Sequence, residues 1–284
     1  MTLISSISGI RGTVNGLNSQ NLTPIDVVKY ASAYGSWINN KNEGKPKTIV
    51  LGRDGRISGQ TILELVKSTL ISMGINIIDT GLSTTPTTQI IIQERRADGG
   101  IILTASHNPK NWNALKLFNS NGEFLSGKQA TEIFNIVEGG EFKFKKEDDY
   151  GKLTILNDAF KIHIDEVKKL NIINLEGIKN KKFTVVVDGI NSSGGIIIPQ
   201  LLHELGVSTV QINCNPDGNF SHNPEPLDKN LSELKNRVVR EKADLGIAVD
   251  PDVDRLVFVC ENGHLFGEEN TIVACADYVL SKSK

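Results

Sequence analysis

The chain has 284 residues, a formal net charge of −2 and 39% hydrophobic residues. This length accommodates two domains of ordinary size or one large barrel, and the hydrophobic content is sufficient for a packed core. The near-neutral charge argues against a general role on nucleic acid or on a membrane surface. The three cysteines show no CxxC spacing, and no hydrophobic run approaches the roughly 20 residues of a membrane span. We therefore expect a cytoplasmic protein without nucleic-acid or membrane partners.

Predicted strands and helices alternate in the first half of the chain. Thr23 and Pro24 have the residue types of a helix N-cap and first helical position, and this helix runs to about Asn39. The further elements expected there are strands at 48–51, 75–78, 100–104 and 114–118 and helices at 60–73 and 86–96. This order predicts a largely parallel sheet, in which ligands lie beyond the carboxyl ends of the strands.

The second half repeats this order after a charged, glycine-containing stretch at 139–151, which we interpret as a domain boundary. Ser192 is predicted to cap a helix, and the loop at 213–230 is too long to be a simple connection. The other elements expected there are helices at 158–170, 192–205, 231–242 and 268–281 and strands at 181–188, 207–212, 244–249 and 256–260.

The expected fold class is therefore α/β, with two consecutive mixed, mostly parallel α/β/α sandwich domains of similar architecture and the start of a third. We place these parts at residues 1–150, 151–257 and 258–284. The last part is one hairpin and one helix, which cannot bury a core by itself.

Three segments of the first half carry candidate functional residues. Ser106 follows a buried strand and precedes an Asn-Pro turn, so its hydroxyl is exposed among free backbone N–H groups that suit a phosphate; the alternative is an ordinary capped turn. Lys116 lies on the strand that returns beside this loop, and otherwise it is a surface lysine. Arg11, between Gly9 and Gly12, either binds a phosphate or belongs to a plain turn.

The loop after the strand at 244–249 contains three alternating aspartates, Asp250, Asp252 and Asp254. In an extended loop their carboxylates can converge on one hard cation, and such an oxygen donor set suits Mg²⁺. Ca²⁺ is the alternative metal, although the loop lacks the glycine and glutamate of an EF-hand, and a solvated acidic turn is the alternative without a metal. The adjacent Arg255 is a candidate phosphate clamp.

These motifs together resemble the α-D-phosphohexomutase superfamily, which includes phosphoglucomutase, phosphomannomutase and phosphoglucosamine mutase. The resemblance rests on Thr104–Pro109, Asp250–Arg255 and Gly9–Gly12. Lesser matches occur at Gly52–Gly59, Asp188–Gly194 and Phe220–Pro226.

The resemblance implies an intramolecular phosphotransferase, an isomerase of carbohydrate metabolism that interconverts hexose 1- and 6-phosphates. It implies that Ser106 is the phosphoserine and binds Mg²⁺ through a phosphate oxygen, together with Asp250, Asp252 and Asp254. Arg11 and Arg255 would stabilise the phosphoryl group, and Lys116 would be the general base or acid, with His107 assisting. Glucose or glucosamine 1,6-bisphosphate would be the intermediate or activator, and glucosamine phosphate is the first choice of substrate.

Two departures from the family pattern and several alternatives accompany this interpretation. Pro251 stands where the family's metal loop commonly has glycine. Family members have four domains, so the chain resembles a fragment without domains III and IV, with low or no turnover by itself. The alternatives are phosphomannomutase or phosphoglucomutase specificity, a Mg²⁺-dependent phosphatase with an aspartate nucleophile, and a sugar-phosphate-binding fragment.

Overall fold

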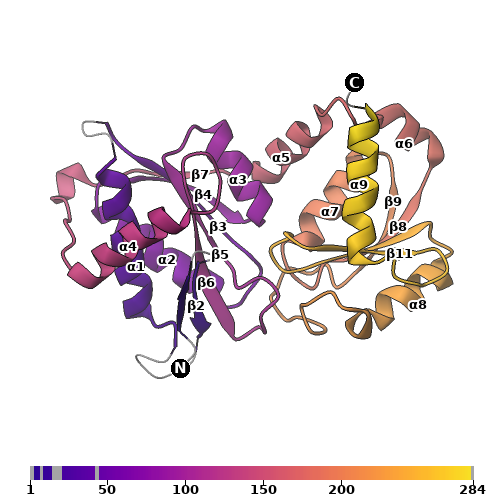
Figure 1. The fold of residues 1–284 in the computed structure, drawn as a ribbon, viewed down its shortest axis with the longest axis horizontal. Helices are drawn as coiled ribbons and strands as arrows, with labels where there is room; N and C mark the ends of the chain where they lie inside the picture. The colour runs from indigo at the N-terminus through magenta and orange to yellow at the C-terminus, as the bar shows by residue number, and fades with distance from the viewer. Residues whose placement is uncertain (1–2, 7–8, 15–20, 42–44, 283–284) are drawn as a thin grey trace. The chain divides into compact units, whose positions relative to one another are not determined.

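The computed structural model describes residues 3–6, 9–14, 21–41 and 45–282. By their contacts the residues divide into two compact units (Figure 1). The first unit contains Met1–Ala105 and Pro109–Ala159, and the second contains Ser106–Asn108 and Phe160–Lys284. The mixed α/β architecture confirms the predicted fold class.

The described strands of the first unit are β1 (Ile4–Ser6), β2 (Gly9–Thr13), β3 (Thr48–Arg53), β4 (Asn76–Leu82), β5 (Gly99–Leu103), β6 (Trp112–Phe118) and β7 (Leu153–Ile155). They form one sheet in the order β1-β2-β6-β5-β3-β4-β7. β5, β3, β4 and β7 run parallel to one another, and β6 pairs with β5 in the antiparallel direction. The parallel strands therefore deliver their carboxyl ends to one edge of the sheet.

Helices cover both faces of this sheet. The described helices are α1 (Pro24–Asn39), α2 (Gly59–Ser72), α3 (Thr85–Glu94), α4 (Gly127–Gly139) and the short 3₁₀ helix η1 (Glu147–Asp149). α1, α2 and α4 share one hydrophobic core with alternate residues of the strands, such as Ile49 and Leu51. α3 packs on the opposite face, where an added Cβ on Gly100 would lie 2.4 Å from Ile92 Cδ1. The predicted cap of α1 is confirmed, because Thr23 and Asp26 form a capping box.

A fully buried ion pair joins the carboxyl ends of β3 and β5. Arg56 Nε lies 3.0 Å from Asp54 Oδ2, and both side chains are completely buried. Asp54 Oδ2 also accepts a hydrogen bond from the hydroxyl of Thr104, at 2.7 Å. Arg56 Nη1 donates to the carbonyl oxygens of Pro109 and Trp112, at 2.6 and 2.9 Å. This pair therefore holds both ends of the segment that carries Ser106.

The second unit has the same three-layer construction. Its described strands and helices are α5 (Ala159–Lys168), α6 (Leu175–Lys181), β8 (Thr184–Asp188), α7 (Gly194–Glu204), β9 (Ser208–Ile212), η2 (Asp228–Asn230), α8 (Ser232–Glu241), β10 (Leu245–Val249), β11 (Leu256–Cys260) and α9 (Glu268–Lys282). The sheet order is β11-β10-β8-β9, with β11 antiparallel to its neighbour. Val186 of β8 belongs to the core on the α8 side, whereas Val185 and Val187 belong to the core on the α7 side.

The predicted elements are present. The structure also contains β1, β2, α4 and α6, which we did not predict, and it differs from the prediction at three further points. Ser192 does not cap α7; the N-cap residue is Ser193, and the hydroxyl of Ser192 donates to Pro251 O at 2.7 Å. The predicted strand at 181–188 begins at Thr184, because Lys181 ends the helix α6. β7, which we did not predict, pairs with β4 and belongs to the first sheet. Its partner is distant in sequence, so local periodicity carried no signal for it.

The long loop at 213–230 is attached to β8 by a buried carboxylate. Asp188 is 1% exposed, and its Oδ2 lies 3.0 Å from His222 Nε2 and 3.2 Å from Asn213 Nδ2. Burial lowers the pKa of His222, but the hydrogen bond and charge of Asp188 outweigh this effect and raise the pKa above 6.5. The protonated imidazole is therefore the form that this contact favours.

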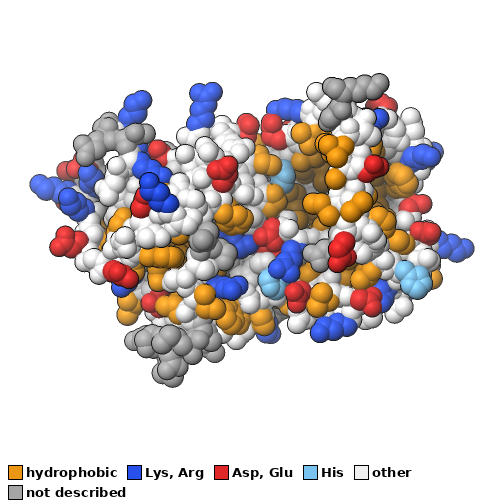
Figure 2. Space-filling view, in the orientation of Figure 1, with side chains coloured by type: hydrophobic (Ala, Val, Ile, Leu, Met, Phe, Trp, Pro, Cys, Tyr) orange, Lys and Arg blue, Asp and Glu red, His pale blue; other side chains and the backbone are white. Residues whose placement is uncertain are grey.

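The last helix is exposed to solvent along much of its length. Hydrophobic side chains gather over α9 (Figure 2), and Ile272, Val273 and Leu280 are 63–72% exposed. The hydroxyl of Tyr278 donates to Ile172 O at 2.8 Å and ties the helix to the segment before α6. None of the helices in the described ranges is long and apolar enough to cross a membrane.

We expect Arg56→Ala to lower the free energy of unfolding by about 3–5 kcal/mol, because it leaves the buried Asp54 carboxylate without its counter-charge. Urea denaturation followed by circular dichroism measures this loss. Arg95→Ala removes the same side chain from an exposed position, and we expect a change within about 0.5 kcal/mol. Equal losses in the two variants would show that the buried pair has no special role in stability.

The contact of His222 with Asp188 makes a contribution to stability that depends on pH. A pKa that is higher in the folded than in the unfolded state gives stability that is complete below about pH 6.5 and is lost as pH rises through the folded value. We therefore expect the stability difference between the wild type and His222→Gln to narrow from about pH 6 to about pH 9. Urea unfolding at both pH values measures this difference. His264→Gln is the control, since His264 is exposed. The difference in free energy of unfolding between this variant and the wild type should be the same at both pH values.

Candidate functional site

Ser106 contacts the aspartate loop within the second unit. Its Oγ donates a hydrogen bond to Asp250 Oδ2 at 2.6 Å and lies 3.3 Å from His107 Nδ1. The backbone of Ser106 is in the left-handed region, with φ 49°. A residue other than glycine rarely adopts this conformation, and such residues concentrate at functional sites. The two loops that the sequence marked as reactive thus meet through one short hydrogen bond.

Asp250 is enclosed by donors from its own loop. Its Oδ1 accepts the backbone N–H groups of Asp254 and Arg255, each at 3.1 Å, and its side chain is completely buried. Val253, which lies between Asp250 and these donors in the chain, adopts φ 60°, a strained value for a β-branched residue. The left-handed turn therefore falls at Val253, so proline is tolerated at position 251, where the family commonly has glycine.

The three aspartates form a cluster of oxygen donors. Carboxylate oxygens of Asp250, Asp252 and Asp254 all lie within 4.8 Å of one another; the first two residues are buried and the third is exposed. Burial and then the charges of the other two aspartates hold the pKa of Asp250 well above its usual range. A bound cation would remove this repulsion. An all-carboxylate donor set that is open on one side suits Mg²⁺, which keeps some of its ligands as water or phosphate.

Arg11 and Lys116 belong to the first unit, on the paired strands β2 and β6. Arg11 lies opposite Ala114, so by the two-residue period of strands Arg11 and Lys116 face the same side of the sheet. Gly9 has φ 123°, and an added Cβ there would lie 2.7 Å from Leu115 O, so the two strands approach too closely at this point for a larger residue. Lys116 is 9% exposed, and the buried Nε of Arg11 finds no hydrogen-bond acceptor among the described residues.

Arg255 has an acidic neighbour that the sequence analysis did not identify. Its Nη1 lies 3.4 Å from Glu225 Oε1, and both side chains are 37% exposed. Glu225 comes from the loop at 213–230, thirty residues upstream, and no local pattern connects it with Arg255. Asp54 and Arg56 were also missed as supports of the serine loop. The sequence feature that could have identified them is an acidic and a basic residue two positions apart at the carboxyl end of a buried strand.

The structure thus brings Ser106, His107, Asp250, Asp252 and Asp254 together within one unit, with Arg255 adjacent in the chain. Arg11 and Lys116 share a sheet face in the other unit. A hydroxyl that touches a carboxylate cluster is an arrangement suited to phosphoryl transfer, which depends on positioning and on neutralising charge.

Comparisons with known proteins agree with this chemistry. Residues 4–144 match the family described as phosphoglucomutase/phosphomannomutase, alpha/beta/alpha domain I, and residues 161–263 match domain II of the same family. A phosphoglucomutase/phosphomannomutase of Thermococcus kodakarensis is 35% identical over 95% of this chain and 59% of its own length. A probable phosphoglucosamine mutase of Pyrococcus horikoshii is 36% identical over 97% of this chain and 57% of its own length.

The fold comparison gives the same result. A crystal structure of a phosphoglucomutase/phosphomannomutase family protein from Burkholderia thailandensis superimposes with a TM-score of 0.81 at 25% identity. It covers 100% of this chain, which in turn covers 60% of that structure. The chain therefore spans somewhat more than half the length of the relatives it matches. Two consecutive family domains, in the order and with the fold seen here, place the chain in the α-D-phosphohexomutase superfamily.

Proposed function

We propose that this chain provides the phosphoserine and the metal site of a hexose-phosphate mutase. The observation that carries the proposal is the 2.6 Å hydrogen bond from Ser106 Oγ to Asp250 Oδ2, beside two further carboxylates. A phosphate on Ser106 would be repelled by three aspartates unless a cation lay between them. The same geometry that suits a divalent cation therefore also suits a phosphoserine.

In the proposed reaction, Ser106 holds the phosphoryl group and presents it to a hydroxyl of a hexose phosphate. The bond from phosphorus to Ser106 Oγ breaks while phosphorus bonds to the sugar oxygen, and the hydroxyl proton passes to Lys116, with His107 assisting. Arg11 and Arg255 stabilise the charge on the phosphoryl oxygens. Mg²⁺, held by Asp250, Asp252 and Asp254, would supply charge neutralisation at the phosphate. Return of the other phosphate of the sugar bisphosphate to Ser106 completes the isomerisation.

Glucosamine phosphate is our first choice of substrate, and glucose and mannose phosphates are the alternatives. The name of the Pyrococcus horikoshii relative supports glucosamine, whereas the name of the Thermococcus kodakarensis relative supports the other two hexoses. We assign phosphoryl and metal binding to this chain. In this proposal residues 1–150 form the domain with the phosphoserine loop, residues 151–257 form the domain with the metal loop, and residues 258–284 begin a third domain. We assign the choice of sugar, and full turnover, to domains III and IV of the relatives.

Ser106→Ala is expected to prevent phosphorylation of the chain. The test is incubation with radiolabelled glucose 1,6-bisphosphate and Mg²⁺, followed by peptide mass spectrometry. In a complete enzyme we expect the same substitution to reduce mutase activity by several orders of magnitude, since each tenfold loss is about 1.4 kcal/mol of barrier.

Ser120→Ala is the matched control, because Ser120 is an exposed serine in a turn of the first unit. It should retain both labelling and activity. Labelling of Asp250 or Asp252 instead of Ser106 would support an aspartate-nucleophile phosphatase and would overturn the proposal.

Asp252→Asn is expected to weaken Mg²⁺ binding by about tenfold or more, or about 1.4 kcal/mol, because it removes one of the charged oxygen ligands. Without Mg²⁺ the variant should be no less stable than the wild type, since the substitution relieves repulsion with Asp250. Isothermal titration calorimetry and thermal unfolding with and without MgCl₂ measure the two effects. Asp277→Asn, at an exposed position on α9, should leave both unchanged; equal weakening in the two variants would exclude Asp252 as a ligand.

A further inference from the structure

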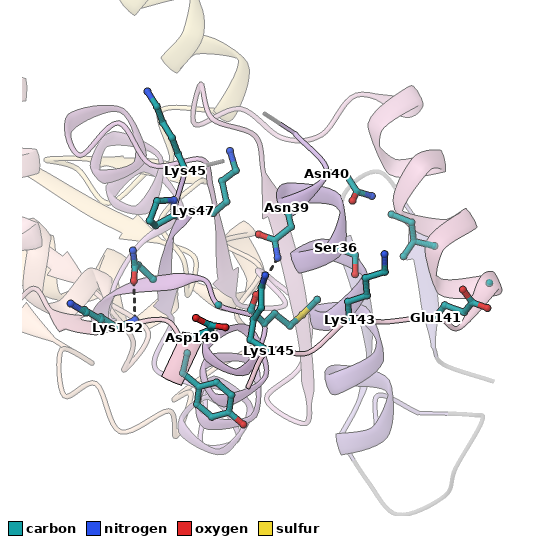
Figure 3. A pocket seen from close by; sticks show the side chains of 17 residues that line it. Ser36, Asn39, Asn40, Lys45, Lys47, Glu141, Lys143, Lys145, Asp149 and Lys152 are labelled. Carbon is teal, nitrogen blue, oxygen red and sulfur yellow. Dashed lines mark hydrogen bonds between the residues drawn. The ribbon is translucent and has the colours of Figure 1, made fainter. Parts of the chain in front are cut away.

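A cavity of about 1050 Å³ opens in the first unit, and its lining is rich in lysine (Figure 3). Its size lies at the upper end of the range for small-molecule sites. The lining includes five lysines but only two carboxylates, those of Glu141 and Asp149. The whole chain has a formal charge of −2, so this excess of positive charge is local. The lysines are Lys45, Lys47, Lys143, Lys145 and Lys152.

The cavity lies at the edge of the first sheet opposite to the carboxyl end of β5. Its lining includes Lys47, which directly precedes β3, and Asn76, which begins β4. α1 ends there at Asn39, and α2 ends at Ser72, directly before the lining residue Met73. In a parallel sheet this edge is remote from the loops that carry the candidate phosphoserine. The cavity is therefore separate from the proposed catalytic site.

Four of these lysines form no direct ion pair with a described residue, although Glu141 and Asp149 also line the cavity. Lys47 is nearly buried and lies 3.4 Å from Asp98, so its charge is balanced. The side chains of Lys45, Lys143, Lys145 and Lys152 make no ion pair or hydrogen bond with another residue of the described ranges. Figure 3 shows Lys143 and Lys145 near Ser36 and Asn39, and Lys45 and Lys152 farther away, on the side of Lys47. Ammonium groups gathered around a cavity raise the local concentration of anions.

The floor of the cavity is held in place by hydrogen bonds. The amide of Asn39 donates to Met73 O at 3.2 Å, and Lys152 N donates to the side chain of Asn76 at 2.9 Å. Lys145 N donates to Ser72 O at 2.8 Å. Gly151 packs so closely that an added Cβ would lie 1.9 Å from Ile75 O. The segment with three of the lysines is thus fixed before a ligand arrives, which lowers the entropic cost of binding.

We propose that this cavity binds an oligophosphate anion, either a nucleotide or an inorganic polyphosphate. Lysine ammonium groups are separate point charges, and a chain of phosphates presents charged oxygens at successive positions that such groups can contact one by one. The amides of Asn39 and Asn40 and the hydroxyl of Ser36 provide neutral hydrogen-bonding groups beside the lysines. The inference stands independently of the proposed mutase activity.

Isothermal titration calorimetry of the 284-residue chain with ATP and with tripolyphosphate, in EDTA, tests the proposal. We expect binding that weakens with added salt, because the interaction is between charges. Replacing Lys143, Lys145 and Lys152 together by Ala should weaken it by about tenfold or more. The matched control replaces the exposed Lys128, Lys181 and Lys229 by Ala. It makes the same change in net charge and should bind within about twofold of the wild type.

Amide shifts in NMR spectra locate the bound anion, with changes expected at Asn40, Lys145 and Lys152. Tighter binding of ATP than of tripolyphosphate would identify a nucleotide site, and equal binding would identify a polyphosphate site. No binding, equal weakening in the two triple variants, or shifts confined to the loops of Ser106 and Asp250 would overturn the proposal. Tighter binding of a hexa-aspartate peptide would likewise overturn it.

Discussion

Repulsion among three carboxylates is the constraint on which the candidate site depends. Asp250 and Asp252 are buried, Asp254 is nearby, and their oxygens lie within 4.8 Å of one another. Burial and mutual charge hold the pKa of Asp250 well above its usual range. The loop keeps this arrangement through backbone N–H groups directed at Asp250 Oδ1 and through a left-handed Val253. Such a cluster is costly by itself, and the proposed cation would supply the compensating charge from outside the chain.

The serine loop depends on a different kind of support. Its ends are fixed by the buried pair of Asp54 and Arg56, which bonds Thr104 on one side and Pro109 and Trp112 on the other. A buried pair of this kind contributes little net stability compared with a hydrophobic replacement. Removing one of its two partners, however, strongly destabilises the fold, because the other charge is left buried and unpaired. Its value here is geometric, because it specifies where the loop leaves β5. Ser106, at φ 49°, then continues from a fixed starting point.

The two edges of the first sheet have different chemistry. The carboxyl edge leads to the serine loop, where the proposed phosphoserine would need a cation between its phosphate and the aspartates. The opposite edge, where α1 and α2 end, carries lysines around a cavity, and there an anion would be attracted directly. Helix carboxyl ends carry partial negative charge, so nearby lysines also interact favourably with them. Four lysines unpaired among the described residues, less the carboxylates of Glu141 and Asp149, leave two positive charges, which exceed the charge of about one that two helix ends supply together.

The sequence by itself determined the structural features that depend on interactions between residues close together in the chain. The hydrophobic runs at β3, β5, β8 and β10 predicted buried strands, Thr23 and Pro24 predicted the start of α1, and the alternation of Asp250, Asp252 and Asp254 predicted convergent carboxylates. These signals are local, because capping, strand period and loop spacing act over a few residues. Only the tertiary structure decided the pairing of β7 with β4, the use of the Ser192 hydroxyl on Pro251, the contact of Arg255 with Glu225, and the lysine-lined cavity. Each of these joins segments far apart in the chain, and such contacts follow from how the elements pack, which no short pattern encodes.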